Sequence, residues 1–231
     1  MMKMKNIIQI SFVILLLAWV ASCGKDNYDA PESTLTGQLV YNGKPIQVRG
    51  TSEAVQLQLF QDNWPNRNAI AVYVTQDGSF TAKLFDGEYK LVTRDRNGPW
   101  ENTRDTTVIN LKGSFHLDLN VTPFFVVSDA RNISTANQTL SASLDITQVV
   151  SSAQLERVYL ILSKTQFADE VHNLIRKDIT GVAPGNNISL SVNLSEAEVT
   201  NINNAPTLFG RIGVKTSGTD QAIWTPVVKL K

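Results

Sequence analysis

Two tryptophans lie in polar, proline-containing segments, and their surroundings are suited to holding a sugar. Trp64 stands in "DNWPNR" and Trp100 in "RNGPWENTRD". An indole ring stacks on the C–H face of a sugar, while neighbouring polar groups bind its hydroxyls. The polar neighbours predicted to do so are Asn63, Arg67, Asn97, Glu101 and Arg104. The alternative is that each indole folds back as a lid over the end of its own domain.

Residues that could carry catalysis are few. The chain has only two histidines, His116 and His172. His116 alternates with Asp118 and Asn120, an arrangement that any solvated strand face produces, and no serine elbow or cysteine accompanies it. His172 has no second histidine at metal-ligand spacing. We therefore predict a non-enzymatic protein with no catalytic residue, metal site or cofactor.

The single cysteine, Cys23, directly follows a segment with the layout of a secretory signal. Two lysines precede an apolar run over about residues 7–20, and two small residues come next. That run is shorter than the roughly 20 apolar residues of a spanning helix, so cleavage after residue 22 is expected. The order Val20-Ala21-Ser22-Cys23 resembles the bacterial lipobox. This resemblance implies acylation of Cys23 and attachment to a membrane through lipid.

Composition indicates which partners the protein can bind and what stabilises its fold. The chain has 231 residues, is 42% hydrophobic, and balances 21 basic against 21 acidic side chains. Loss of the signal removes two lysines and leaves a slight acidic excess, which does not favour nucleic acid as a partner. With one cysteine there is no intrachain disulfide, so hydrophobic cores must stabilise the fold.

A polar tether over residues 23–34 leads to a first predicted domain over residues 35–122. Hydrophobic residues there recur with period two, as in "VQLQLF", and Asn-Gly or Asp-Gly pairs mark hairpin turns. The order "LTGQLVYNGKPI", "VQLQLF", "QDGSFTAKLFDGEYKLV", "FHLDLNV" resembles the transthyretin-like or carboxypeptidase-regulatory-like β-sandwich. The polar insertion "QDNWPNRNA" departs from that pattern. The resemblance implies a non-catalytic module.

Residues 123–231 are predicted to form a second β-sandwich of immunoglobulin or fibronectin-III type. "LSASLDI" and "NISLSVNL" alternate, and "RVYLILS" is a continuous apolar run suited to a buried central strand. Pro226 in "AIWTPVVKL" indicates an edge or bulged strand, and Trp224 beside it is expected in the core. Only "KTQFADEVHNLIRK" shows helical spacing, which leaves a helical turn or a loop open. The predicted class is all-β, with two sandwiches in tandem.

Together, the anchor, tether and two sandwiches resemble a Bacteroidetes family of two-domain lipoproteins of unknown function. These often accompany outer-membrane glycan transporters. The resemblance implies an outer-membrane, surface-exposed lipoprotein that binds glycan or assists polysaccharide uptake, with a glycan and a transporter complex as partners.

Two further expectations come from short segments. A structural or adhesive protein is the alternative function, and it would dock a partner protein through the sheet edge "AIWTPVVKLK". "DTT" at residues 105–107 resembles an O-glycosylation sequon of the same bacterial group and points to Thr106.

Overall fold

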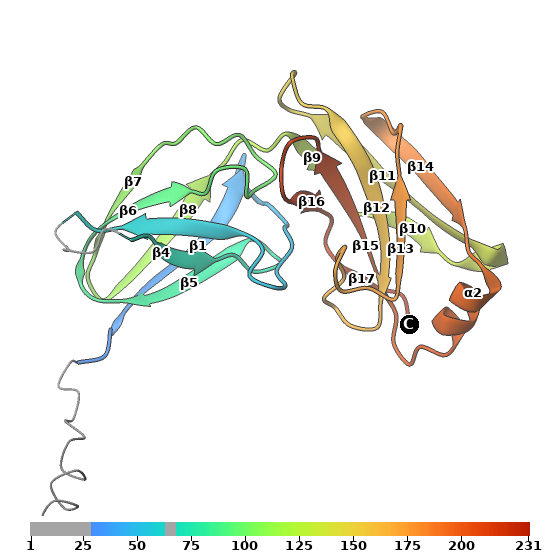
Figure 1. Ribbon diagram of the computed structural model, residues 1–231, viewed down its shortest axis with the longest axis horizontal. Helices are drawn as coiled ribbons and strands as arrows, with labels where there is room; N and C mark the ends of the chain where they lie inside the picture. Colours follow the sequence, from blue (N-terminus) through green and yellow to red (C-terminus); the bar gives the residue numbers. More distant parts are fainter. Residues whose placement is uncertain (1–28, 63–67) are drawn as a thin grey trace, which may run out of the picture. The chain divides into compact units, whose positions relative to one another are not determined.

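The computed structural model describes residues 29–62 and 68–231. Every strand and helix of that part lies in one compact unit, Glu32–Lys231. Four β-sheets form two successive two-layer sandwiches (Figure 1). The predicted all-β class with two sandwich domains is confirmed. No helix in the described part has the length and apolar character needed to cross a membrane.

The first sandwich contains eight strands in two sheets. One sheet places β1 between an antiparallel β5 and a parallel β8, with the short β2 also paired to β1. The other has the order β4-β3-β6-β7. The strand bounds are β1 Ser33–Tyr41, β2 Lys44–Pro45, β3 Gln56–Phe60, β4 Ile70–Tyr73, β5 Ser79–Leu84, β6 Gly87–Thr93, β7 Thr107–Leu111 and β8 Ser114–Asn120.

The alternation of apolar and polar residues along the strands explains which side chains form the core of this sandwich. Leu57 and Leu59 of β3 are fully buried, and Phe80 of β5 and Tyr89 of β6 are 1% and 2% exposed. Burial of such side chains contributes about 1.5–3 kcal/mol each before entropy is counted. Near the starts of β4 and β8, Ile70 and Phe115 depart from this burial and are 38% and 37% exposed. Both lie on strands with a partner on one side only, where the core no longer covers them.

Predicted turn residues form turns. Asn42 and Gly43 join β1 to β2 with φ of 50° and 71°, the left-handed pair of a tight hairpin. The carboxylate of Asp77 accepts hydrogen bonds from the Thr75 hydroxyl at 2.6 Å and the Ser79 N–H at 3.1 Å. The hydrogen bond from Thr75 lowers the pKa of Asp77. This aspartate therefore stabilises a turn.

The second sandwich also has two sheets. One pairs β11 with β10, β14 and β9, and the other has the order β13-β12-β15-β16, with β17 also on β15. The bounds are β9 Phe125–Val127, β10 Arg131–Ser134, β11 Thr139–Gln148, β12 Leu155–Ser163, β13 Ile175–Ile179, β14 Gly185–Asn193, β15 Phe209–Thr216, β16 Ala222–Trp224 and β17 Val228–Lys229. A 3-10 turn, η1, covers Ala136–Gln138.

The α-helix of this sandwich lies where sequence analysis placed none. Residues 164–174 form an irregular loop with bends before β13, so the loop alternative applies there. Instead α2, Glu196–Asn203, follows β14 (Figure 1). Ser195 and Glu198 form a capping box, and Lys177 of β13 pairs with Glu198 at 2.7 Å. The spacing Ser-x-x-Glu was the local signal for this helix.

The edge strand predicted around Pro226 is confirmed. Pro226 separates β16 from β17, and both short strands pair with β15 alone. The N–H of Trp224 donates to the carbonyl of Gln47 in the first sandwich at 3.0 Å. Part of the edge considered for docking a partner protein is thus already occupied within the chain.

Candidate functional site

Trp100, predicted to be an exposed sugar platform, is 4% exposed. Its backbone pairs with Pro123, and its ring packs so closely over Gly98 that an added Cβ would lie 2.2 Å from the ring. The expectation of an exposed indole at Trp100 is wrong, and the lid alternative describes this residue. Trp64, the other half of the predicted platform, lies outside the described residues, as do Asn63, Arg67 and Cys23.

The polar residues predicted around Trp100 divide into two kinds. Asn97 is 7% exposed and clamps the backbone, since its Nδ2 donates to the Ala54 carbonyl at 2.8 Å and its Oδ1 accepts from the Gln56 N–H at 2.7 Å. This residue is therefore a buried structural support, with both the oxygen and the nitrogen of its amide bound to the backbone. Glu101, Arg104 and Thr106 are exposed on the segment before β7, and Arg104 pairs with Asp95 at 3.2 Å.

Each of the two histidines lies beside an aspartate. His116 is exposed on β8, as predicted, with Nε2 3.2 Å from Asp118 and Nδ1 3.1 Å from the Thr36 hydroxyl. The Nδ1 of His172 lies 3.5 Å from the buried Asp169. Within residues 29–62 and 68–231, no group of three or more His, Cys, Asp or Glu side chains is placed to hold a metal ion.

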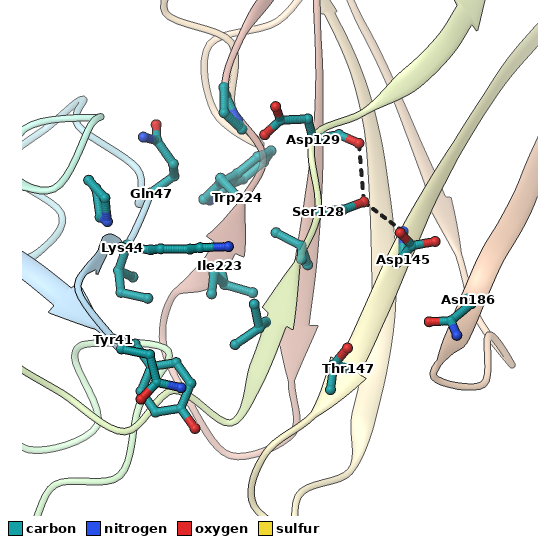
Figure 2. A pocket seen from close by; sticks show the side chains of 16 residues that line it. Tyr41, Lys44, Gln47, Ser128, Asp129, Asp145, Thr147, Asn186, Ile223 and Trp224 are labelled. Atoms are coloured by element: carbon teal, nitrogen blue, oxygen red, sulfur yellow. Dashed lines mark hydrogen bonds between the residues drawn. The ribbon is translucent and has the colours of Figure 1, made fainter.

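A cleft of about 750 Å³ lies between the β1–β2 hairpin and strands β9, β11 and β16. Its volume falls in the range of about 300–1,000 Å³ usual for small-ligand sites. The walls come from segments as distant in sequence as Tyr41 and Trp224 (Figure 2). Sequence analysis did not find this site.

The base of the cleft is apolar. Ile46 of the hairpin and Ile223 of β16 are 4% and 3% exposed, and Val126 and Val127 of β9 are half-buried. Trp224 also contributes an edge, although it is 1% exposed. This side chain is held rigidly, because it stacks on Tyr159 at 5.8 Å between centroids and fills the space over Gly213. Its assignment to the core is confirmed.

The rim of the cleft is polar. The polar residues that line it are Asn42, Lys44, Gln47, Ser128, Asp129, Asp145, Thr147 and Asn186. They bring amides, hydroxyls, an ammonium and carboxylates around an apolar base (Figure 2). A few placed polar groups over an apolar lining are typical of a site for a small organic ligand.

Asp145 is the rim residue with the most constrained geometry. Arg131 binds it through two N–H groups at 2.8 and 3.0 Å, and the Asn187 N–H donates at 2.6 Å. The hydrogen bonds from Arg131 and then Asn187 lower the pKa of Asp145 to about 2. Its charge is therefore compensated within the second sandwich, and it is fixed in position.

Polar contacts around the buried Arg211 join the two walls of the cleft. The group formed by Arg211, Asp169 and Glu170 with their partners in the first sandwich is here called the Arg211 cluster. Arg211 of β15 is 1% exposed, and its Nη2 donates to the carbonyls of Val48 at 3.0 Å and Gln76 at 3.3 Å in the first sandwich. Its Nε donates to the Thr225 carbonyl at 2.8 Å. Burial lowers the pKa of Arg211 to about 9, against the opposing charges of Asp169 and Glu170. The side chain is thus still a cation at neutral pH.

The loop between β12 and β13 completes the Arg211 cluster. Asp169, fully buried, accepts a hydrogen bond from the Thr51 hydroxyl at 2.6 Å. Glu170 forms an ion pair with Arg49 at 2.6 Å, with both side chains about 15% exposed. These half-buried contacts join the loop to the first sandwich, so polar interactions hold both walls of the cleft.

Fold and site together define a protein of two tandem β-sandwiches with a ligand-sized cleft. Two family models match it: the "Protein of unknown function (DUF3823) N-terminal domain" over residues 33–122 and the "Domain of unknown function (DUF3823_C)" over residues 125–229. The chain belongs to this two-domain DUF3823 family. The predicted resemblance to a two-domain family of unknown function is thereby confirmed. No protein with a curated description matches it.

Solved structures agree with this assignment. A DUF3823 family protein from Parabacteroides merdae is 49% identical, with a TM-score of 0.82, over 88% of this chain and 100% of that chain. One from Bacteroides ovatus is 30% identical, with a TM-score of 0.73, over 86% and 98%. A protein from Bacteroides uniformis, described as a proposed carbohydrate binding protein, shares the fold at 14% identity, with a TM-score of 0.71 over 87% and 99%.

Proposed function

We propose that this protein is a non-catalytic glycan-binding lipoprotein that assists polysaccharide uptake at the outer membrane. The observation that carries the glycan part is the cleft, whose apolar base and rim of amides and hydroxyls match the two surfaces of a sugar ring. C–H faces pack on apolar side chains, and hydroxyls exchange hydrogen bonds with amides. The description of the Bacteroides uniformis protein with the same fold supports the same class of ligand.

The cleft replaces the two-tryptophan platform as the proposed sugar site. Trp100 is buried, so it offers no ring face to a ligand. Asn42, Gln47 and Asn186 take the role of hydroxyl-binding amides. Because the Arg211 cluster joins the walls, the site needs little rearrangement before binding, which limits the entropy cost of association.

Direct binding tests the glycan proposal. The full-length chain, applied to an array of plant, animal and microbial oligosaccharides, is expected to bind at least one class. Isothermal titration with the best ligand is expected to give one site per chain. An array with no signal above that of a heat-unfolded sample would remove glycan binding as the function.

The membrane part of the proposal rests on Cys23. We expect cells grown with a fatty-acid analogue to label the wild-type chain and not the Cys23→Ser variant, because acylation needs the thiol. Two or more acyl chains hold a protein stably at a bilayer. The measurement is the label on the purified chain together with its partition into the outer-membrane fraction. Equal membrane recovery of the serine variant would contradict the lipid anchor.

A further inference from the structure

Lys44 is a cation in the cleft without a partner in the described part of the chain. It occupies the first position of β2 and is exposed, and Figure 2 shows its side chain extending from the hairpin into the cleft. Among residues 29–62 and 68–231 it forms no ion pair. It is the one cationic side chain among the described residues that line the cleft.

The carboxylates across the cleft do not neutralise Lys44. Asp145 is bound by Arg131 at 2.8 Å. Asp129 is exposed and, in the same described ranges, has no ion-pair partner either, although it lines the opposite wall. The cleft therefore has a positive side on the hairpin and a negative side on the second sandwich. A ligand that spans it meets both.

A ligand that covers Lys44 must compensate its charge. The side chain extends over an apolar base that includes Ile46 and Ile223. Displacing water from an ammonium on such a surface is costly unless an anion or strong acceptor replaces that water. An anionic group of the ligand provides this. A carboxylate such as Asp129 instead accepts hydrogen bonds from neutral hydroxyls and repels a second anion.

We propose that the cleft selects a saccharide that carries an anionic group, which binds Lys44, while neutral hydroxyls of the same saccharide donate to Asp129. The anionic group is a carboxylate, as in a uronic acid, or a sulfate ester, since both present the same charge-assisted acceptor to an ammonium. This inference rests on the proposed glycan binding and names the class of sugar.

The test compares three tetrasaccharides by titration against the full-length chain: tetragalacturonate, maltotetraose and sulfated maltotetraose. The wild type is expected to bind one or both anionic ligands at least about tenfold more tightly than maltotetraose. Lys44→Gln is expected to lower the affinity for the anionic ligands about tenfold, which is about 1.4 kcal/mol. Raising the salt concentration is expected to lower the affinity for the two anionic ligands and to leave the affinity for maltotetraose unchanged. The stronger of the two anionic ligands identifies carboxylate or sulfate.

Lys112→Gln is the matched control, because Lys112 is an exposed lysine in the β7–β8 turn that does not line the cleft. It is expected to leave all three affinities unchanged. Equal binding of the neutral and anionic ligands, with no effect of Lys44→Gln, would overturn the anionic-sugar inference and leave glycan binding intact. Loss of anionic binding in Lys112→Gln as well would show only a general charge effect and also overturn it. No binding of these ligands or of any arrayed glycan would overturn both proposals.

Discussion

Replacement of Arg211 by alanine is expected to lower the free energy of unfolding by about 3–5 kcal/mol, the cost of removing one partner from a buried charged network. The guanidinium is 1% exposed and donates to the carbonyls of Val48, Gln76 and Thr225. The variant leaves these acceptors buried without this donor and removes the positive charge that interacts with fully buried Asp169. Urea unfolding followed by tryptophan fluorescence measures the change.

Arg104→Ala is the control for this prediction. Arg104 is also an arginine near a carboxylate, but its side chain is 79% exposed beside Asp95. Exposed pairs contribute about 0–1 kcal/mol, so this variant should unfold almost as the wild type does. If Arg211→Ala lost no more stability than Arg104→Ala, the Arg211 cluster would not be what holds the two walls of the cleft.

Filling the cleft is expected to remove glycan binding. Thr147 of β11 is exposed and lines the cleft (Figure 2). Thr147→Trp places an indole in the space of a sugar ring, so the affinity for the best glycan is expected to fall by at least about a hundredfold, or about 2.8 kcal/mol. Titration calorimetry measures the affinity, and the thermal midpoint shows whether the variant is folded.

Ser191→Trp provides the control for the filled cleft. Ser191 is exposed on β14, pairs with Ser141 of the same sheet as Thr147, and does not line the cleft. The added indole has the same size and the same sheet environment, so binding should persist. Equal affinity of the folded Thr147→Trp variant and the wild type would place the glycan site elsewhere.

The local sequence pattern predicted most of the fold, because apolar and polar residues alternate along a strand with one buried face. Leu57, Leu59 and Phe80 follow that rule and are buried. Trp100 was misjudged because its polar neighbours indicated an exposed turn, while Gly98 and the backbone pairing with Pro123 draw the indole inward. The helix α2 was missed although Ser195 and Glu198 form a capping box. The alternating strand pattern of β14 runs up to this box without a polar loop between them.

The cleft could not be predicted from local sequence patterns, because contacts between distant segments of the chain bring its walls together. Lys44 reads as an ordinary turn-flanking lysine, and Trp224 as an ordinary core residue. Long-range contacts, among them the hydrogen bond from the Trp224 N–H to Gln47 and those of Arg211, place the hairpin beside β16. Sequence spacing carries no signal for such contacts, since 177 positions separate Gln47 from Trp224.

The most direct test of glycan binding in the cleft is a crystal structure of the full-length chain with the oligosaccharide that binds most tightly on the array. We predict sugar density between the β1–β2 hairpin and strand β16, with an anionic group within hydrogen-bond distance of the Lys44 amine. Density for that sugar at any other surface, with the cleft containing water alone, would contradict it.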